Sequence, residues 1–322
     1  MDFINKVNSF LEKDSGDLQK LIVIYGPTAS GKTTLSIEMA KYLETEIIST
    51  DSRQIFIGLD IGTGKITSDE KNGIIHHMID IIEPNQEYSV GQFKKVADII
   101  INDIHTKGKI PILCGGTGLY IDSLVYDFNI PEIPAIDNLR NDLEKEALKY
   151  GNEYVYEKLQ KIDPEYAKEL HPNNIRYVIR ALEVKMLTGK SKADFREEKV
   201  LKYDTLFLTP YDGNREELYK KIDARVSQMF DEGLVDEVNN LLNKYNSDVF
   251  GLQTIGYKEV SDLLLDLGIQ YNGDKKFNLG EKVKYGIKLD IKETIELVQK
   301  NNRNYAKKQL TWFRKYEPEK NI

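Results

Sequence analysis

Residues 21–33 read LIVIYGPTASGKT, a short apolar run followed by a glycine-rich segment that ends in Lys-Thr. The segment 26–33 fits the phosphate-binding pattern G-x-x-x-x-G-K-[ST], with a strand predicted before it and a helix predicted after it. In this pattern, backbone N–H groups and the positive end of the helix surround phosphate oxygens. An ordinary strand–helix turn needs neither this spacing nor this lysine. We therefore expect residues 26–33 to bind a diphosphate or a triphosphate.

The pattern predicts different roles for two side chains of the loop. Lys32 supplies a mobile cation, and the Thr33 hydroxyl can ligate Mg²⁺ that is shared with the phosphates. Mg²⁺ is therefore the expected cofactor, and nucleotides such as ATP are possible occupants of the loop. The predicted diphosphate-binding residues are Gly26, Pro27, Thr28, Ala29, Ser30, Gly31, Lys32 and Thr33.

The sequence around this loop is typical of an α/β fold. Residues 21–125 alternate short apolar runs with helical patterns, as in a unit built around a mostly parallel sheet. The predicted strands and helices are 21–25, 46–50 and 110–114 as strands, and 33–43 and 90–107 as helices. Ser89 is a suitable cap for the second helix. We predict a P-loop NTPase-like core with a parallel sheet.

A helical segment interrupts this core. Residues 126–203 lack strand patterns and contain helical ones, with prolines that mark the breaks between helices. A strand pattern returns at 205–209 and long helices follow. The predicted parts are an N-terminal extension 1–20, the first part of the core 21–125, an inserted all-helical domain 126–203, the remainder of the core 204–316 with an irregular loop at 268–288, and a tail 317–322.

Composition excludes several classes of protein. No apolar run approaches the roughly 20 residues of a membrane helix, and the first twenty residues lack the apolar core of a secretory signal. The single cysteine, Cys114, cannot form an internal disulfide and indicates a reducing compartment. With 45 basic and 52 acidic residues, the net charge of −7 argues against indiscriminate binding to nucleic acid. We expect a cytoplasmic protein without a membrane partner.

A candidate carboxylate follows the second predicted strand. The strand 110–114 ends in glycines and Thr117 rather than in the metal-binding acid of an ATPase, whereas Asp51 follows the strand 46–50. Ligands of open α/β sheets bind at the carboxyl ends of the strands, so Asp51 and Thr117 should face the crevice beside the loop. Asp51 could be an ordinary turn residue. The polar run Asp51-Ser52-Arg53-Gln54 makes a functional role more plausible.

Two other features favour structural roles. His76 and His77 suggest a metal site, but the remaining histidines and the cysteine do not supply zinc-ligand spacing. We expect these two histidines to lie in a structural turn. Cys114, at the end of a buried strand, is expected to serve packing.

The ordered set of motifs resembles tRNA dimethylallyltransferases over roughly residues 21–315. The matching segments are Gly26–Thr33, Asp51–Gln54, Asp60–Lys65, His76–Asp80, Tyr88–Val90, Gly115–Tyr120, His171–Asn174 with Arg180–Glu183, Gln253–Lys258 and Tyr305–Arg314. The resemblance implies transfer of a dimethylallyl group from dimethylallyl diphosphate to the exocyclic amine of the adenosine on the 3′ side of the tRNA anticodon. The loop would then hold a leaving diphosphate rather than a phosphoryl group in transfer.

The resemblance also assigns roles to residues. Lys32, Thr33 with Mg²⁺, and Arg225 would neutralise charge on the leaving group. Asp51 would be the general base on the adenine amine, and Thr117 would orient that amine or the bridging oxygen. The residues that it implies for tRNA binding are Asp51, Ser52, Arg53, Gln54, Thr117, Arg140, Arg176, Tyr177, Val178, Ile179, Arg180, Gln253, Thr254, Ile255, Gly256, Tyr257 and Lys258.

Two basic segments could extend an RNA surface. Residues 300–316 contain six basic residues and no acidic one, interleaved with Tyr305, Trp312, Phe313 and Tyr316, and residues 165–202 contain nine basic and six acidic residues. Each alone is usually a solvated helix face, but together in an acidic protein they favour a local RNA-binding surface. The expected partners are a tRNA anticodon stem-loop and dimethylallyl diphosphate, and we expect a monomer.

Three alternatives remain open from the sequence. A prenyltransferase acting on free adenine nucleotides would need neither a helical insert nor a basic C-terminal helix. A small-molecule P-loop kinase gives no reason for the sets 51–54 and 115–120. A non-enzymatic nucleotide switch gives no reason for a base beside the loop.

Overall fold

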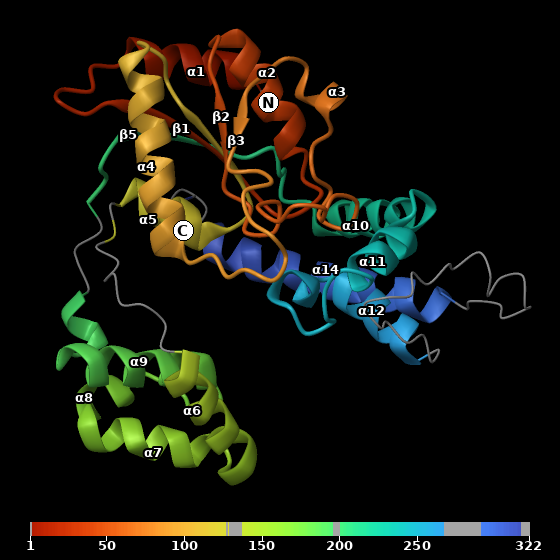
Figure 1. Ribbon diagram of the computed structural model, residues 1–322. Helices are drawn as coiled ribbons and strands as arrows, with labels where there is room; N and C mark the ends of the chain where they lie inside the picture. The colour runs from red at the N-terminus through yellow and green to blue at the C-terminus, as the bar shows by residue number, and fades with distance from the viewer. Residues whose placement is uncertain (1, 127, 129–136, 196–199, 267–290, 317–322) are drawn as a thin grey trace, which may run out of the picture. The chain divides into compact units, whose positions relative to one another are not determined.

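The computed structural model describes residues 2–126, 128, 137–195, 200–266 and 291–316. The chain divides into two compact units, the first formed by residues 1–126 with 201–322 and the second by residues 127–200. Most helices and strands of the two units are labelled in Figure 1. None of the described helices is both long and apolar enough to cross a membrane.

The first unit contains the sheet and most of the helices. Its elements are α1 (Phe3–Glu12), β1 (Lys20–Tyr25), α2 (Lys32–Tyr42), β2 (Ile47–Ser49), α3 (Ser68–Lys71), β3 (His76–His77), α4 (Val90–Thr106), β4 (Ile112–Gly115), α5 (Gly118–Val125), β5 (Asp204–Leu208), α10 (Arg215–Asp231), α11 (Leu234–Leu242), the 3₁₀ helix η2 (Phe250–Gln253), α12 (Tyr257–Asp266), α14 (Lys292–Phe313) and η3 (Arg314–Tyr316). The second unit contains α6 (Asp137–Tyr150), α7 (Asn152–Ile162), α8 (Pro164–Ala167), α9 (Ile175–Thr188) and η1 (Lys192–Phe195).

The five strands form one parallel sheet in the order β3-β2-β4-β1-β5. Strand β1 lies between β4 and β5, with Ile22 opposite Ile112 on one side and opposite Leu206 on the other. Because all strands run in the same direction, the residues that follow them meet at one edge of the sheet. The loop after β1, the turn after β2 and the glycines after β4 are thereby brought together.

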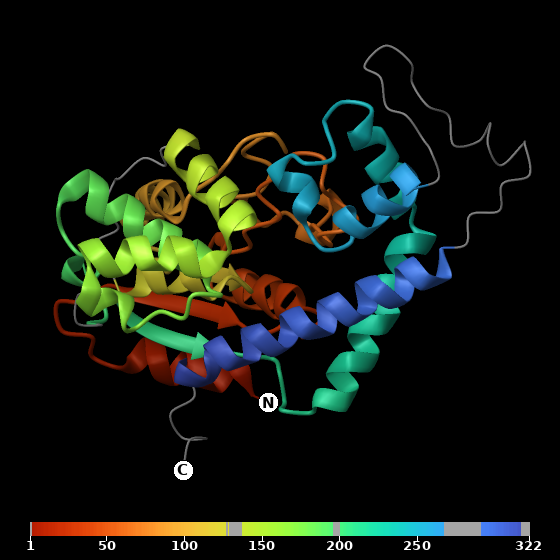
Figure 2. The same cartoon turned by 90° about the horizontal axis from the view of Figure 1, so that it is seen from below.

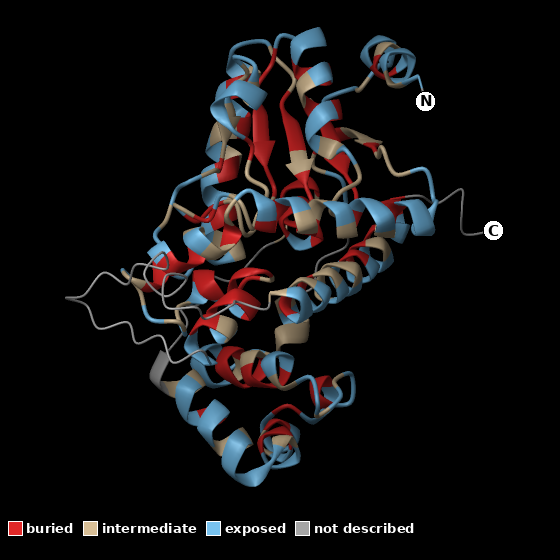
Figure 3. Cartoon of the chain, turned by 90° about the vertical axis from the view of Figure 1, so that its right-hand side faces the viewer, coloured by how far each residue is buried: buried red, intermediate tan, exposed pale blue. Residues whose placement is uncertain are grey.

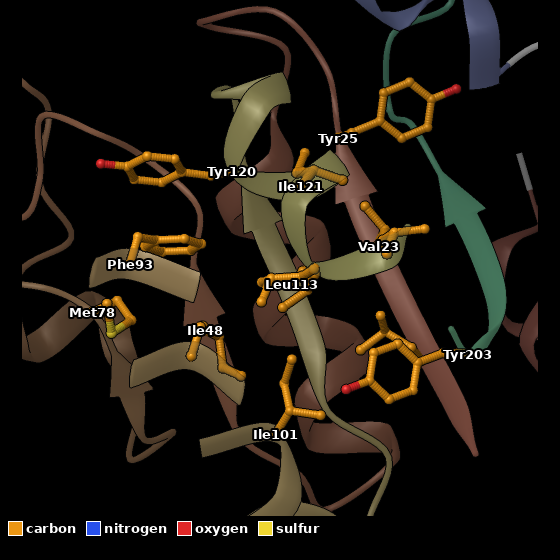
Figure 4. Close-up of a cluster of buried hydrophobic side chains, with 14 of the residues drawn as sticks. Val23, Tyr25, Ile48, Met78, Phe93, Ile101, Leu113, Tyr120, Ile121 and Tyr203 are labelled. Carbon is orange, nitrogen blue, oxygen red and sulfur yellow. The ribbon is translucent and has the colours of Figure 1, made fainter. Parts of the chain in front are cut away.

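Alternating side chains of the strands pack against helices on both faces of the sheet. Val23, Ile48 and Leu113 belong to one cluster with buried residues of α4 and α5, in which the rings of Phe93 and Tyr120 stack at 3.9 Å between centroids (Figure 4). Their neighbours along the strands face α1 and α2 instead. Strands β1, β2 and β4 are almost wholly buried, and Figure 3 shows the outer faces of the helices as exposed.

A second apolar cluster lies beyond the edge of the sheet. It joins the loop 55–59 to α10, α11, α12 and α14, and Tyr257 and Phe56 are fully buried in it. Helices α10 and α14 contact each other, and they cross in the view of Figure 2. Their packing fixes the side chains of both helices that point toward the carboxyl edge of the sheet.

The helical unit has a small core of its own. Leu143, Val155, Leu159, Val178 and Leu182 are buried in it and bring α6, α7 and α9 together. This core also encloses a charged group. The carboxylate of Glu183 is fully buried and accepts hydrogen bonds from the guanidinium groups of two arginines, Arg140 and Arg180, at 3.1 Å.

The predicted α/β class with a parallel sheet is confirmed, and the predicted strands lie within about one to two residues of the observed ones. The cap at Ser89 is confirmed, since Ser89 and Gln92 form a reciprocal capping box. The turn expected at His76 and His77 is wrong. These residues form β3, paired with Ile47 and Ile48 at the edge of the sheet.

Other expectations concern the ends and the long loop. Part of the N-terminal segment that the sequence set apart as an extension forms α1, whose Val7 and Phe10 pack in the cluster beneath the sheet. The tail at 317–322 and the irregular loop at 268–288 lie outside the described residues.

Candidate active site

The candidate site is a cavity of about 290 Å³ in the first unit, at the carboxyl edge of the sheet. Its lining comes from segments that are far apart in the sequence. They are Thr28, Ala29, Lys32 and Thr33 of the glycine-rich loop 26–33, residues 51–54 after β2, residues 62–64, Cys114 and Gly115 of β4, four residues of α10, residues 253–255, and Asn302, Tyr305 and Gln309 of α14. Predicted cationic and carboxylate residues therefore share one cavity.

The glycine-rich loop 26–33, which the sequence predicts to bind phosphate, has a backbone that depends on glycine. Gly31 immediately precedes α2 with φ +89°, a left-handed conformation that favours glycine. The first N–H groups of α2 have no partner within the helix and are available to an anion. Lys32 and Thr33 line the cavity, whereas Gly26 and Pro27 line a separate cavity of about 170 Å³.

Lys32 is held close to its own loop. Its Nζ donates a hydrogen bond to the carbonyl of Pro27 at 2.7 Å. Burial lowers the pKa of Lys32 to about 8, although the neighbouring Cys114 and Asp51 oppose this shift. The ammonium group therefore occupies an environment that favours an added negative charge.

The turn after β2 orients Asp51 and ties it to Thr117. The carboxylate of Asp51 accepts a hydrogen bond from the backbone N–H of Arg53 at 2.8 Å. The hydroxyl of Thr117 accepts a bond from the N–H of Ser52 at 3.0 Å and donates to the Ser52 hydroxyl at 3.2 Å. The structure thus brings Asp51 and Thr117 to adjoining turns, as the parallel-sheet argument predicts, although Thr117 itself is not part of the cavity wall.

Arg225 reaches the cavity from α10. Its guanidinium donates to the hydroxyl of Thr28 at 3.0 Å and to the carbonyls of Thr63 and Gly64 at 3.3 and 3.5 Å. Burial lowers the pKa of Arg225, while Asp51 acts in the opposite direction. Gly64 has φ +57°, and a Cβ atom there would collide with the guanidinium, so this close approach requires glycine.

Three residues of α14 line the cavity and were not predicted as site residues, Asn302, Tyr305 and Gln309. The carboxamide of Gln309 accepts from the N–H of Thr28 and donates to the carbonyl of Gly116, both at 2.9 Å. Tyr305, one turn earlier, interacts with Thr117 and Gln309 through its hydroxyl. Burial of this hydroxyl, followed by the charge of Asp51, raises the pKa of Tyr305 to about 12. The basic pattern of residues 300–316 favoured a surface role and concealed this contribution.

The other predicted RNA contacts of the first unit fall into two groups. Gln253, Thr254 and Ile255 line the cavity together with Ser52, Arg53 and Gln54. Tyr257 is fully buried, and its hydroxyl donates to Glu237. Lys258 lies at the surface and pairs with Asp262 at 2.6 Å, and Gly256, at φ +93°, precedes α12.

The aromatic residues at the end of α14 also separate into two groups. Trp312 and Tyr305 are partly exposed, at 39% and 36% of their surfaces. Phe313 and Tyr316 are buried against Tyr25, with ring centroids 5.1 Å away in both pairs. Phe313 and Tyr316 therefore belong to the core beside the sheet and are not available to an RNA surface.

In the helical unit, the predicted RNA-binding residues also differ in exposure. Arg176 and Tyr177 are exposed at the start of α9. The side chains of Val178 and Ile179 are buried in the core of this unit, so an RNA contact from them would have to come from the backbone. Arg140 and Arg180 are both engaged with Glu183.

Possible metal ligands are sparse in the described part of the chain. No group of three or more His, Cys, Asp and Glu side chains there is arranged to hold a metal ion. His77 instead meets Glu46, with Nε2 at 2.6 Å from the carboxylate. Cys114 was expected to be a packing residue, but it is half-buried and also lines the cavity.

The fold and the cavity define a mixed α/β protein whose candidate site joins Lys32 of the glycine-rich loop to the carboxylate of Asp51. The family model described as IPP transferase matches residues 54–316, and the model described as isopentenyl transferase matches residues 19–88. The tRNA dimethylallyltransferase of Halothermothrix orenii is 47% identical over 303 residues, which cover 93% of this chain and 86% of the relative. That of Caldanaerobacter subterraneus is 42% identical and covers 92% and 90%.

Solved structures show the same relationship. The tRNA isopentenylpyrophosphate transferase of Bacillus halodurans matches with a TM-score of 0.61 and 41% identity, over 92% of this chain and 87% of that chain. A eukaryotic dimethylallyltransferase, described as acting on tRNA, matches with a TM-score of 0.73 and 31% identity, over 92% and 70%. The chain belongs to the IPP transferase family.

Proposed function

We propose that this chain transfers the dimethylallyl group of dimethylallyl diphosphate to N6 of the adenosine on the 3′ side of the anticodon in tRNA, releasing diphosphate. The names of its relatives support this activity. The observation that carries the proposal is the single cavity that holds both Lys32 and Arg225 for an anion and Asp51 for a proton. The enzyme is proposed to act as a monomer in the cytoplasm.

The proposal also gives the two units distinct tasks. The first unit is proposed to be a P-loop NTPase-like core whose loop holds the diphosphate of the donor. The second unit is proposed to be an inserted tRNA-binding domain, with the exposed Arg176 and Tyr177 among its RNA contacts. In the first unit, Gln253, Thr254 and Ile255 are proposed to contact the anticodon loop at the mouth of the cavity.

The donor half of the site acts on the leaving group. Charge on the diphosphate increases as its bond to C1 of the dimethylallyl group breaks, so fixed cations stabilise the transition state more than the ground state. Lys32 and Arg225 supply these cations. The exposed hydroxyl of Thr33 and the phosphate oxygens form a hard oxygen set that suits Mg²⁺. Mg²⁺ held there would add charge neutralisation on the leaving group.

The acceptor half of the site prepares the amine. The N6 lone pair is delocalised into the adenine ring, so it attacks poorly without proton removal. The carboxylate of Asp51 accepts the N6 proton as N6 forms its bond to C1 and the C1–O bond breaks. The hydroxyl of Thr117 orients the amine or the bridging oxygen, and Ser52, Arg53 and Gln54 hold the edge of the base.

The adenine must leave the stacked anticodon loop to reach this cavity. RNA loops are recognised by stacking and by contacts to base edges, supplemented by contacts to phosphates. The exposed lysines of α14, Lys307 and Lys308, and the partly exposed Trp312 provide such groups in the first unit.

The test is a transfer assay with labelled dimethylallyl diphosphate. Label should enter an unmodified tRNA transcript that carries adenosine at the target position, and it should not enter the same transcript with guanosine there. AMP in place of tRNA should give no labelled product. Label in AMP but not in tRNA would overturn the proposal in favour of a free-nucleotide prenyltransferase.

A further inference from the structure

We propose that Gln309 is a positioning residue that locks the donor half and the acceptor half of the site into one geometry. This inference rests on the proposed function, because it assigns Thr28 with Arg225 to the donor side and Thr117 to the acceptor side. It concerns a buried carboxamide of α14 that lines the cavity.

The carboxamide of Gln309 lies between two loops at the carboxyl edge of the sheet. Gln309 accepts from the N–H of Thr28 in the phosphate-binding loop and donates to the carbonyl of Gly116, both at 2.9 Å. A Cβ atom on Gly116 would collide with the Gln309 Nε2, so the glycine is required for this approach. One side chain therefore spans the loop after β1 and the loop after β4.

Each hydrogen bond of Gln309 is made to a residue next to a group with a proposed role in the reaction. Thr28 also accepts the hydrogen bond of Arg225, so the Thr28–Gln309 bond fixes the residue on which the guanidinium rests. Gly116 directly precedes Thr117, whose hydroxyl is bonded to Ser52 beside Asp51. A shift of the carboxamide would move the cationic groups relative to the base. Misplacement of reacting groups by about 1 Å can cost roughly 10²-fold in rate.

The chain offers a matched control on the same helix. Gln299 also lies on α14, and its Nε2 donates to the carbonyl of Asp223 at 3.2 Å and to the hydroxyl of Ser227 at 3.4 Å. It therefore ties α14 to α10 with two bonds of its side chain, but it is not part of the cavity wall. Gln→Met at either position removes the hydrogen bonds of the carboxamide while nearly preserving the length of the side chain, and at Gln309 the lost bonds include the one with the Tyr305 hydroxyl.

The first experiment compares Gln309→Met and Gln299→Met in the transfer assay, with the thermal unfolding midpoint of each variant measured in parallel. Gln309→Met should lower kcat by about 10²-fold at saturating donor. Its Kd for tRNA should change by less than about threefold, since no RNA contact is removed. Gln299→Met should retain more than about half of the wild-type kcat. Equal losses of kcat in the two variants, or full activity of Gln309→Met, would overturn the inference.

A second variant gives a readout that a merely structural role would not move. In Gln309→Glu, the ionised carboxylate accepts from Thr28 but cannot donate to Gly116, whereas the protonated carboxyl group does both. Burial and the charge of Asp51 raise the pKa of such a carboxyl group, against the charges of Lys32 and Arg225 that line the same cavity. The ratio of kcat for Gln309→Glu to that of the wild type should therefore rise as pH falls from about 8.5 to about 6. A ratio independent of pH contradicts the proposed two-bond geometry.

The outcome separates this inference from the proposed function. If the wild-type protein transfers no label to tRNA, the proposed function fails. If the wild type is active and Gln309→Met is equally active, only the positioning role fails. Gln309→Met adds no charge, so its loss of kcat separates geometry from the repulsion that the carboxylate of Gln309→Glu would exert on the diphosphate.

Discussion

The arginines of the two units have opposite surroundings. In the cavity, Arg225 donates to neutral oxygens only among its described hydrogen-bond partners, the Thr28 hydroxyl and the carbonyls of Thr63 and Gly64. In the helical unit, Arg140 and Arg180 both donate to the fully buried carboxylate of Glu183. The first arrangement orients a positive charge without neutralising it. The second uses positive charge to stabilise an internal anion.

This difference distinguishes a cation placed for a ligand from a cation placed for the fold. Because neutral oxygens do not neutralise Arg225, its positive charge can stabilise a diphosphate that binds in the cavity. Arg140 of α6 and Arg180 of α9 instead offset the free-energy cost of burying the Glu183 carboxylate. Removing either arginine leaves this buried charge with fewer partners. Substitutions of arginines in the two units should therefore have different effects on activity and on stability.

The largest effect is expected at the base. Asp51→Asn keeps an oxygen that can accept from the N–H of Arg53 but removes the group that takes the N6 proton. General-base catalysis contributes about 10²–10⁴ in rate, so kcat should fall by this factor while tRNA affinity stays within about threefold. Single-turnover transfer and tRNA titration measure the two quantities. Turnover above half of the wild-type value would remove Asp51 from the mechanism.

The comparison is tested most directly by removing Arg225. Arg225→Gln should lower kcat/KM for the donor by about 10²–10³, as for loss of one group that stabilises leaving-group charge. Its free energy of unfolding should change by less than about 1 kcal/mol, since no buried carboxylate loses a partner. Donor titration and chemical denaturation check this pair of values. A large loss of stability with unchanged donor kinetics would make Arg225 a structural arginine.

The sequence predicts the site residues that belong to local patterns, but it does not predict contacts between residues far apart along the chain. The loop 26–33 and Asp51 follow from local patterns and from the rule that parallel strands share a carboxyl edge. Gln309 lies 281 positions from Thr28, and no local pattern indicates that its carboxamide reaches the loop. Strand β3 has two residues, too few for a periodic signal.

The helical unit illustrates a different limit. Arg180 and Glu183 are spaced i,i+3 on α9, a spacing that predicts an ion pair on one helix face. The family resemblance implies RNA contacts for Arg140 and Arg180, and it does not indicate that Arg180 pairs with Glu183. Burial of Glu183 depends on the packing of α6 and α7 against α9, which the sequence alone does not determine.

A smaller effect is expected from the titration of Lys32. Burial lowers its pKa to about 8, so raising pH through 8 removes the cation from the free enzyme. The ratio of the affinities of wild type and Lys32→Arg for inorganic pyrophosphate, in which the titration of the ligand cancels, should be constant below this pH and then fall by up to about tenfold per pH unit, because binding needs the proton. Calorimetric titration between about pH 7 and pH 9.5 measures this.

Stability should respond to this titration in the opposite sense. The pKa of Lys32 lies below its ordinary value of 10.5, so between about pH 8 and pH 10.5 the unfolded chain binds more protons than the folded one. The contribution of Lys32 to the free energy of unfolding therefore rises with pH in this window. Lys32→Arg, whose guanidinium stays charged, is the control for both measurements and should show neither dependence.

The smallest expected effect compares two arginines of α9. Arg176→Gln removes an exposed charge and should weaken tRNA binding only a few-fold, with the slope of log affinity against log salt reduced by about one. Arg180→Gln removes a partner of Glu183 and should lower the free energy of unfolding by about 1–3 kcal/mol. Titrations of tRNA at several salt concentrations and denaturation of each variant separate the two roles. If Arg180→Gln reduces the salt slope without loss of stability, Arg180 contacts phosphate. The contrast with Arg225 would then no longer hold, since a cation paired to a carboxylate would still serve the ligand.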